Sequence, residues 1–171
     1  MRASAQWYST PSDPGRCVLV DIDGVLSDAS SRQHYLNNPE GRRDWRGFFG
    51  AVGDDLPLSA VPALLALLDR SLSVVLLSAR PVWVFQMTVD WLQRHAMRWD
   101  LLILRGDDEI GDASDFKRGV LHELRSMGWD VALAIDDDER IIEMYRSEDQ
   151  VALYLHSGYY AAPTTTLQPP P

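Results

Sequence analysis

The stretch "VLVDIDGVLSD" (18–28) joins a strongly apolar run to two carboxylates, Asp21 and Asp23, one residue apart. The run is too short for a buried helix and is rich in Val, Leu and Ile, which is typical of a strand covered on both faces of a parallel sheet. Because side chains alternate along a strand, Asp21 and Asp23 are predicted to point in the same direction. A lone pair of this kind can also cap a turn, so the rest of the chain has to support a functional interpretation.

Short apolar runs alternate with segments of helical period along the rest of the chain. This order predicts an α/β, doubly wound, Rossmann-like parallel sheet with helices on both faces. The predicted strands are residues 17–22, 72–78, 100–105, 131–135 and 151–155, and the predicted helices are residues 58–70, 82–96, 114–127 and 139–147.

The length and composition predict one domain. A chain of 171 residues with 46% hydrophobic residues is enough for a single sizeable core. We expect residues 17–160 to form this domain and residues 1–16 to be a flexible N-terminus. The ending "AAPTTTLQPPP" (161–171) has much proline and little apolar surface, which predicts a disordered Pro/Thr-rich tail.

Charge and cysteine content limit the partners that we expect. A formal net charge of −9 repels polyanions at long range, so extensive duplex binding is not expected, and any nucleic-acid contact needs a local basic patch. The single cysteine, Cys17, can form no internal disulfide, which fits a reducing compartment. We see no signal-peptide pattern and no apolar run of about 18 residues, so the predicted location is cytoplasmic, without a membrane partner. The oligomeric state is left open.

Polar groups follow three of the predicted strands. Ser78 and Arg80 end the second strand, and Asp136 and Asp137 end the fourth. Since ligands of open parallel sheets bind at the carboxyl ends of the strands, these groups are predicted to meet Asp21 and Asp23. Clustered carboxylates need a cation, and hard oxygen ligands suit Mg²⁺. A carboxylate that also attacks as a nucleophile favours a phosphate ester as the target.

Four sequence features resemble the motifs of the haloacid dehalogenase (HAD) superfamily of phosphatases. They are "DIDGV", the serine after the second strand, a lysine before the fourth strand and the "DDD" after it. The resemblance implies Asp21 as nucleophile, Asp23 as general acid and base, and Ser78 with Lys117 as the groups that hold the phosphate. It implies Mg²⁺ bound by Asp21, Asp136, Asp137 and the backbone carbonyl of Asp23. Lys117 is the single lysine of the chain, although it could also be an ordinary charge on a helix face.

A closer resemblance is to the 3′-phosphatase domain of bacteriophage polynucleotide kinase/phosphatase. "VALAIDDDERIIEMYRS" (131–147) is similar to the last motif of that domain, and "DWRGFF" (44–49) looks like a helical segment that follows the first motif in related small phosphatases. The resemblance implies phosphate contacts for Arg32 and Arg80. The segments 29–72 and 81–116 look too short for a large cap domain, and no kinase-type "GxxxxGK[ST]" occurs.

The sequence therefore predicts a Mg²⁺-dependent phosphomonoesterase that acts through an aspartyl-phosphate, with a 3′-phosphate on a nucleic-acid end or nucleotide as substrate. A phosphatase of free nucleotides or of another small metabolite is the alternative. A non-catalytic binding module on the same fold is a further alternative, but every chemical position of the motifs is filled. Asp138 is interpreted equally as a site residue or as the N-cap of the following helix. Trp45, Phe48 and Phe49 could stack a base or belong to the core.

Overall fold

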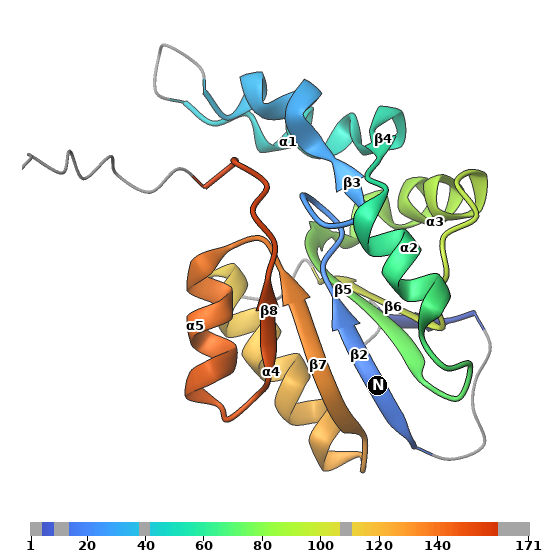
Figure 1. Ribbon diagram of the computed structural model, residues 1–171. Coiled ribbons are helices and arrows are strands. Elements are labelled where there is room, and N and C mark those ends of the chain that lie inside the picture. Colours follow the sequence, from blue (N-terminus) through green and yellow to red (C-terminus); the bar gives the residue numbers. More distant parts are fainter. Residues whose placement is uncertain (1–4, 9–13, 38–41, 107–110, 161–171) are drawn as a thin grey trace, which may run out of the picture.

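The central strand of the fold is β2 (Arg16–Val20), and its alternate side chains enter two separate cores. The computed structural model describes residues 5–8, 14–37, 42–106 and 111–160. Val18 and Val20 pack on the face that carries α2 (Ala60–Leu67) and α3 (Phe85–Arg94). Cys17 and Leu19 pack on the opposite face, against α4 (Ala113–Ser126) and α5 (Glu139–Ser147). Figure 1 shows these two helical layers on either side of the sheet.

Within the described residues, the main sheet has six strands in the order β1-β6-β5-β2-β7-β8. The strands that join β2 in this sheet are β1 (Ala5–Trp7), β5 (Ser73–Pro81), β6 (Leu101–Arg105), β7 (Asp130–Asp136) and β8 (Ala152–Tyr154). All neighbours are parallel except β1, which runs antiparallel to β6. The α/β prediction is confirmed, and each of the five predicted strands and four predicted helices has a counterpart in the structure.

Strand β1 corrects part of one expectation. Residues 1–16 were expected to be a flexible N-terminus, but Ala5–Trp7 pairs with Leu101–Ile103, and Trp7 stacks on Trp129 with ring centroids 5.5 Å apart. The pairing and the aromatic contact place this short segment at the sheet edge. The predicted tail, residues 161–171, lies outside the described residues, and the domain boundary at residue 160 stays a prediction.

The segment between β2 and β5 contains short elements and no large cap domain within its described residues. They are β3 (Ser27–Asp28), the 3₁₀ helix η1 (Ala29–Tyr35), α1 (Trp45–Gly50), the 3₁₀ helix η2 (Val52–Asp54) and β4 (Leu56–Pro57), followed by α2. A third 3₁₀ helix, η3 (Val82–Val84), precedes α3. The helical segment expected at residues 44–49 is confirmed as α1, whose N-cap is Asp44. None of the helices in the described ranges is long and apolar enough to cross a membrane.

Candidate active site

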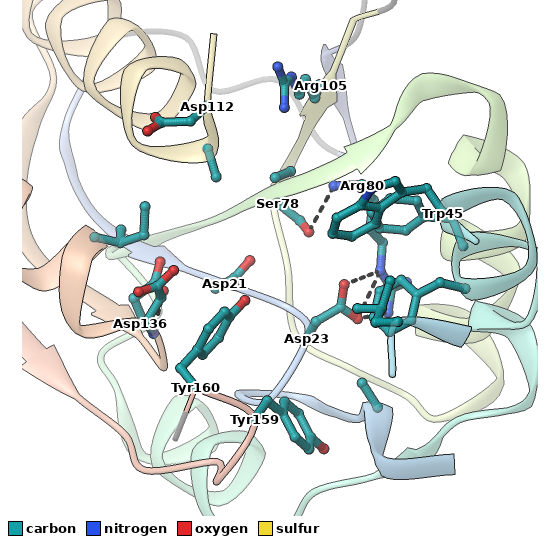
Figure 2. A pocket seen from close by; sticks show the side chains of 18 of the residues that line it. Asp21, Asp23, Trp45, Ser78, Arg80, Arg105, Asp112, Asp136, Tyr159 and Tyr160 are labelled. Carbon is teal, nitrogen blue, oxygen red and sulfur yellow. Dashed lines mark hydrogen bonds and ion pairs between the residues drawn. The ribbon is translucent and has the colours of Figure 1, made fainter. Parts of the chain in front are cut away.

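The carboxyl ends of three neighbouring strands form the floor of one cavity of about 990 Å³. Asp21 directly follows β2, where its N–H donates to the Ile135 carbonyl of β7 over 3.0 Å. Ser78 lies in β5, and Asp136 is the last residue of β7. Asp21, Asp23, Ser78, Arg80, Lys117 and Asp136 all line the cavity. The structure thus brings together the groups that the sequence placed at strand ends, as Figure 2 shows.

Lys117 lies between two of the carboxylates. Its Nζ is 2.6 Å from Asp136 Oδ2 and 3.2 Å from Asp21 Oδ2, and its side chain is buried. Burial alone would lower the pKa of Lys117, but the charges of Asp136 and Asp21 hold it well above its usual value. Lys117 therefore supplies a fixed positive charge beside Asp21, where an incoming phosphate would need one.

Asp21, Asp136 and Asp137 offer oxygen atoms that all lie within 4.8 Å of one another. Asp21 Oδ1 and both carboxylate oxygens of Asp137 are buried, and none of them pairs with a cation of the described residues; the neutral Ser157 hydroxyl lies beside Asp137. Burial, with the charges of neighbouring acids, raises the pKa of Asp21 to about 7 and that of Asp137 to about 8. Buried carboxylate oxygens without a cationic partner are the feature that a hard divalent cation would satisfy, so these residues fit Mg²⁺.

Gly24 makes the approach of Asp137 possible. It has a φ of +78°, a left-handed conformation that favours glycine, and a Cβ built on it would lie 2.0 Å from Asp137 Oδ2. The turn after β2 can therefore pass against Asp137, which directly follows β7, only because residue 24 has no side chain. This explains the glycine of the "DIDGV" motif in packing terms.

Asp23 is held differently from Asp21. Its carboxylate accepts hydrogen bonds from Arg80, with Nη2 at 2.6 Å and Nε at 3.1 Å, and from Arg32 Nη2. Burial would raise the pKa of Asp23, but the two guanidinium groups lower it to about 2. The contacts of Arg32 and Arg80 with substrate phosphate, implied by the family resemblance, stay predictions. In the structure, both arginines contact Asp23.

Asp55 is a component of the site that the sequence analysis missed. Its buried carboxylate accepts from Arg32 Nε at 2.9 Å and Nη2 at 2.8 Å, and lies 3.5 Å from Arg80 Nη2. Ser27 Oγ also donates to it, and Trp91 Nε1 donates to its backbone carbonyl over 2.8 Å. Asp54, its neighbour in "GDDLP", is exposed, so local sequence gives no signal that separates the two acids.

Ser78 and Asp138 have clear local roles. Ser78 Oγ accepts a hydrogen bond from the backbone N–H of Arg80 over 3.3 Å, so its hydroxyl hydrogen can still be donated to a ligand in the cavity. Asp138 accepts from the backbone N–H of Arg140 over 3.0 Å and is the N-cap of α5, which confirms that interpretation.

Aromatic side chains form the walls above the carboxylates. Trp45, Phe48 and Phe49 of α1 all line the cavity, but Phe48 is buried whereas Trp45 is exposed. Phe48 therefore fits the core interpretation of this segment, and Trp45 fits the base-stacking one. Tyr159 and Tyr160, which follow β8, line the cavity from elsewhere and were not singled out from the sequence.

The fold and the site define a phosphatase of the HAD type. The family model described as "Polynucleotide kinase PNKP phosphatase domain" matches residues 15–159. The chain belongs to this family.

Solved structures show the same fold. A chain of the Pnkp1/Rnl/Hen1 RNA repair complex matches with a TM-score of 0.67 and 22% identity, covering 91% of this chain and 47% of that one. A second structure of a Pnkp1/Rnl/Hen1 complex matches with a TM-score of 0.68 and 22% identity, covering 91% and 50%. The protein thus spans about half the length of each of these chains. Comparison with curated proteins finds no match.

Proposed function

We propose that this domain is a Mg²⁺-dependent phosphomonoesterase that forms an aspartyl-phosphate on Asp21 and removes a 3′-phosphate from nucleic-acid ends or nucleotides. The observation that carries the proposal is the environment of the Asp21 carboxylate. Oδ1 is buried beside the other acids, where it would bind the cation, while Oδ2 lies 3.2 Å from the Lys117 ammonium in a side chain that lines the cavity. One oxygen would thus hold the metal, and the other, beside the positive charge of Lys117, would attack the phosphate.

The proposed reaction has two steps. The Asp21 carboxylate forms a bond to phosphorus while the bond from phosphorus to the ester oxygen breaks, and Asp23 gives a proton to the leaving oxygen. Water then attacks the aspartyl-phosphate, Asp23 takes a proton from that water, and inorganic phosphate leaves with Asp21 regenerated. Ser78, Lys117 and Arg80 would neutralise the phosphoryl oxygens.

Asp23 needs a change of partners to act as an acid. With both guanidinium groups bound to it, its pKa of about 2 is too low for proton donation at neutral pH. A phosphate in the cavity offers Arg80 other oxygens to bind. We infer that substrate draws guanidinium charge from Asp23 to the phosphoryl group, which reconciles the contacts in the structure with the substrate-binding role predicted for Arg80 and Arg32.

Asp21, Asp136, Asp137 and the backbone carbonyl of Asp23 would hold the Mg²⁺. When bound, the ion neutralises charge on the phosphoryl group during transfer. Both oxygens of Asp136 are already engaged, with the Lys117 ammonium and with the N–H of Asp138, whereas the buried Asp137 carboxylate has the neutral Ser157 hydroxyl beside it and no ion pair among the described residues. This difference favours Asp137 as the direct ligand of the two.

The 3′-phosphate is proposed from the family to which the chain belongs and from the likeness to chains of an RNA repair complex. The alternative substrate is the phosphate of a free nucleotide or another small metabolite, which the net charge of −9 favours over a long polyanion. The cytoplasmic location stays a prediction.

The test is phosphate release with Mg²⁺ from a matched set of substrates: a 3′-phosphorylated oligonucleotide, a 5′-phosphorylated one, a 3′-mononucleotide and a 5′-mononucleotide. We expect release from the 3′-phosphates, arrest by EDTA and recovery with Mg²⁺. Asp21→Asn should lose more than about 10³-fold in kcat with an unchanged fold. Asp130→Asn, at the opposite end of β7, is the control and should keep wild-type activity.

Each part of the proposal has its own contrary result. Preference for 5′-mononucleotides would contradict the 3′-phosphate substrate and favour a role in nucleotide metabolism. Turnover by Asp21→Asn would exclude the covalent intermediate, and turnover in EDTA would exclude the metal.

A further inference from the structure

Trp45 is a large aromatic side chain whose exposure packing does not explain. It is 47% exposed at the start of α1, and it lines the same cavity as the carboxylates. Phe49 stacks against it, with ring centroids 5.7 Å apart and an angle of 19° between the planes. The Arg43 guanidinium lies 5.8 Å from the centre of the indole ring. The result is an exposed aromatic surface with a positive charge over its indole ring.

The position of Trp45 is fixed relative to the reacting groups. The Asp44 N–H donates to the Tyr35 carbonyl over 2.9 Å, and the Asp44 carboxylate accepts from the Gly47 N–H over 2.8 Å. Phe48 is buried beneath the guanidinium of Arg32, 4.2 Å from its ring centre, and the same guanidinium binds Asp23. Helix α1 is therefore tied to the site through Arg32, and its aromatic surface is preorganised.

The cavity is larger than a phosphate group requires. Its volume of about 990 Å³ lies at the upper end of the range of about 300–1,000 Å³ that holds drug-sized ligands. Tyr160, 46% exposed with the Arg140 guanidinium 5.6 Å from its ring centre, lies on the other side of Asp21 and Asp23 from Trp45 (Figure 2). A phosphate at Asp21 thus leaves space beside Trp45 for the group that carries it.

We propose that Trp45 stacks on the base of the nucleotide whose phosphate is removed. Every nucleobase has a π-face, so stacking on Trp45 selects nucleotides over other phosphate esters without reading their sequence. The guanidinium of Arg43 adds a positive charge beside the same base, in a chain that otherwise repels polyanions. This inference rests on the proposed function, because it assigns a place to the base of that substrate.

Trp83 provides a matched control within the same chain. It is 45% exposed and carries the Arg46 guanidinium 5.4 Å from its ring centre, but it is not among the residues that line the cavity. Trp45→Ala and Trp83→Ala therefore remove equally exposed indoles with similar cationic neighbours. Trp45→Phe keeps a smaller aromatic surface.

The experiment compares kcat/KM for a 3′-phosphorylated oligonucleotide with a normal last base and for one whose last residue is abasic. We expect Trp45→Ala to lower kcat/KM for the normal substrate about 5- to 150-fold, mainly through KM, and to leave the abasic substrate unchanged. Trp45→Phe should recover most of the loss, and Trp83→Ala should behave as wild type. Fluorescence anisotropy of both oligonucleotides with Asp21→Asn, alone and combined with Trp45→Ala, measures binding without turnover.

The outcomes separate the inference from the proposed function. Equal losses on the normal and abasic substrates, or an equal loss in Trp83→Ala, would overturn the stacking role while leaving the 3′-phosphatase activity in place. A wild-type enzyme that releases no phosphate from either oligonucleotide would contradict the proposed function. In that case, anisotropy would still decide whether Trp45 binds the base. Equal affinity of Asp21→Asn and of the Asp21→Asn, Trp45→Ala double variant for the normal oligonucleotide would reject the stacking role.

Discussion

At the scale of single residues, the site depends on a buried acid that takes no direct part in the proposed chemistry. Asp55 binds Arg32, which binds Asp23, and both arginines are buried. Without Asp55, the guanidinium of Arg32 would lose its pairing over Nε and Nη2 in a place that water hardly reaches. A buried charge left with fewer partners is costly, so Asp55 has a large effect on the free energy of unfolding.

We predict that Asp55→Ala lowers the free energy of unfolding by about 3–5 kcal/mol in a urea titration. The control is Asp130→Ala, because the Arg16–Asp130 pair has the same 2.8 Å separation as Arg32–Asp55 but side chains 66% and 64% exposed. Its expected cost is about 0–1 kcal/mol. If the two variants unfold at the same urea concentration, burial does not make the Arg32–Asp55 pair contribute more to stability than the exposed Arg16–Asp130 pair.

At the scale of elements, the sequence predicts what is apolar and regular, and it misses what depends on contacts with distant segments. The strand at residues 16–20 was predictable because both of its faces are buried, and each polar strand end follows such a run. Strand β1 has three residues and no apolar run, and its pairing partner is almost 100 positions away. The same limit applies to Asp55 and Tyr160, whose neighbours in space come from other elements.

In the turn between β2 and β3, the glycine of the "DIDGV" motif, Gly24, is also the residue that packs against Asp137. We predict that Gly24→Ala costs at least about 1–3 kcal/mol of stability and weakens activation by Mg²⁺, because the new Cβ needs a strained φ and displaces Asp137. Thermal unfolding and the Mg²⁺ dependence of phosphate release measure the two effects. Gly15→Ala is the control, since a Cβ at Gly15 meets nothing within 4 Å. Normal Mg²⁺ activation in Gly24→Ala would mean that Asp137 can move without loss.

At the scale of the whole molecule, the site links stability to pH in two opposite directions. The pKa of Asp23 is lowered to about 2, so its contribution is present above the unfolded value of about 3.9 and is lost only as the pH falls toward 2. The pKa values of Asp21 and Asp137 are raised to about 7 and about 8. Their contribution to the free energy of unfolding is full below about pH 4 and is lost as the pH rises through 7 and 8, because these two carboxyl groups ionise at lower pH in the unfolded chain.

We therefore predict that the metal-free protein becomes less stable between about pH 5 and about pH 8, where Asp23 contributes a constant amount. For a chain of this size, each kcal/mol lowers Tm by about 2–4 °C, so a calorimetric scan in EDTA should resolve the change. Mg²⁺ should raise Tm more at the higher pH, because it binds the ionised carboxylates and has to displace protons at the lower one. Asp137→Asn removes one of the two carboxyl groups whose pKa is raised. Its Tm should therefore fall less as the pH rises, and Mg²⁺ should raise its Tm less. A Tm that changes with pH equally in Asp137→Asn and in wild type would place the titrating groups elsewhere in the protein.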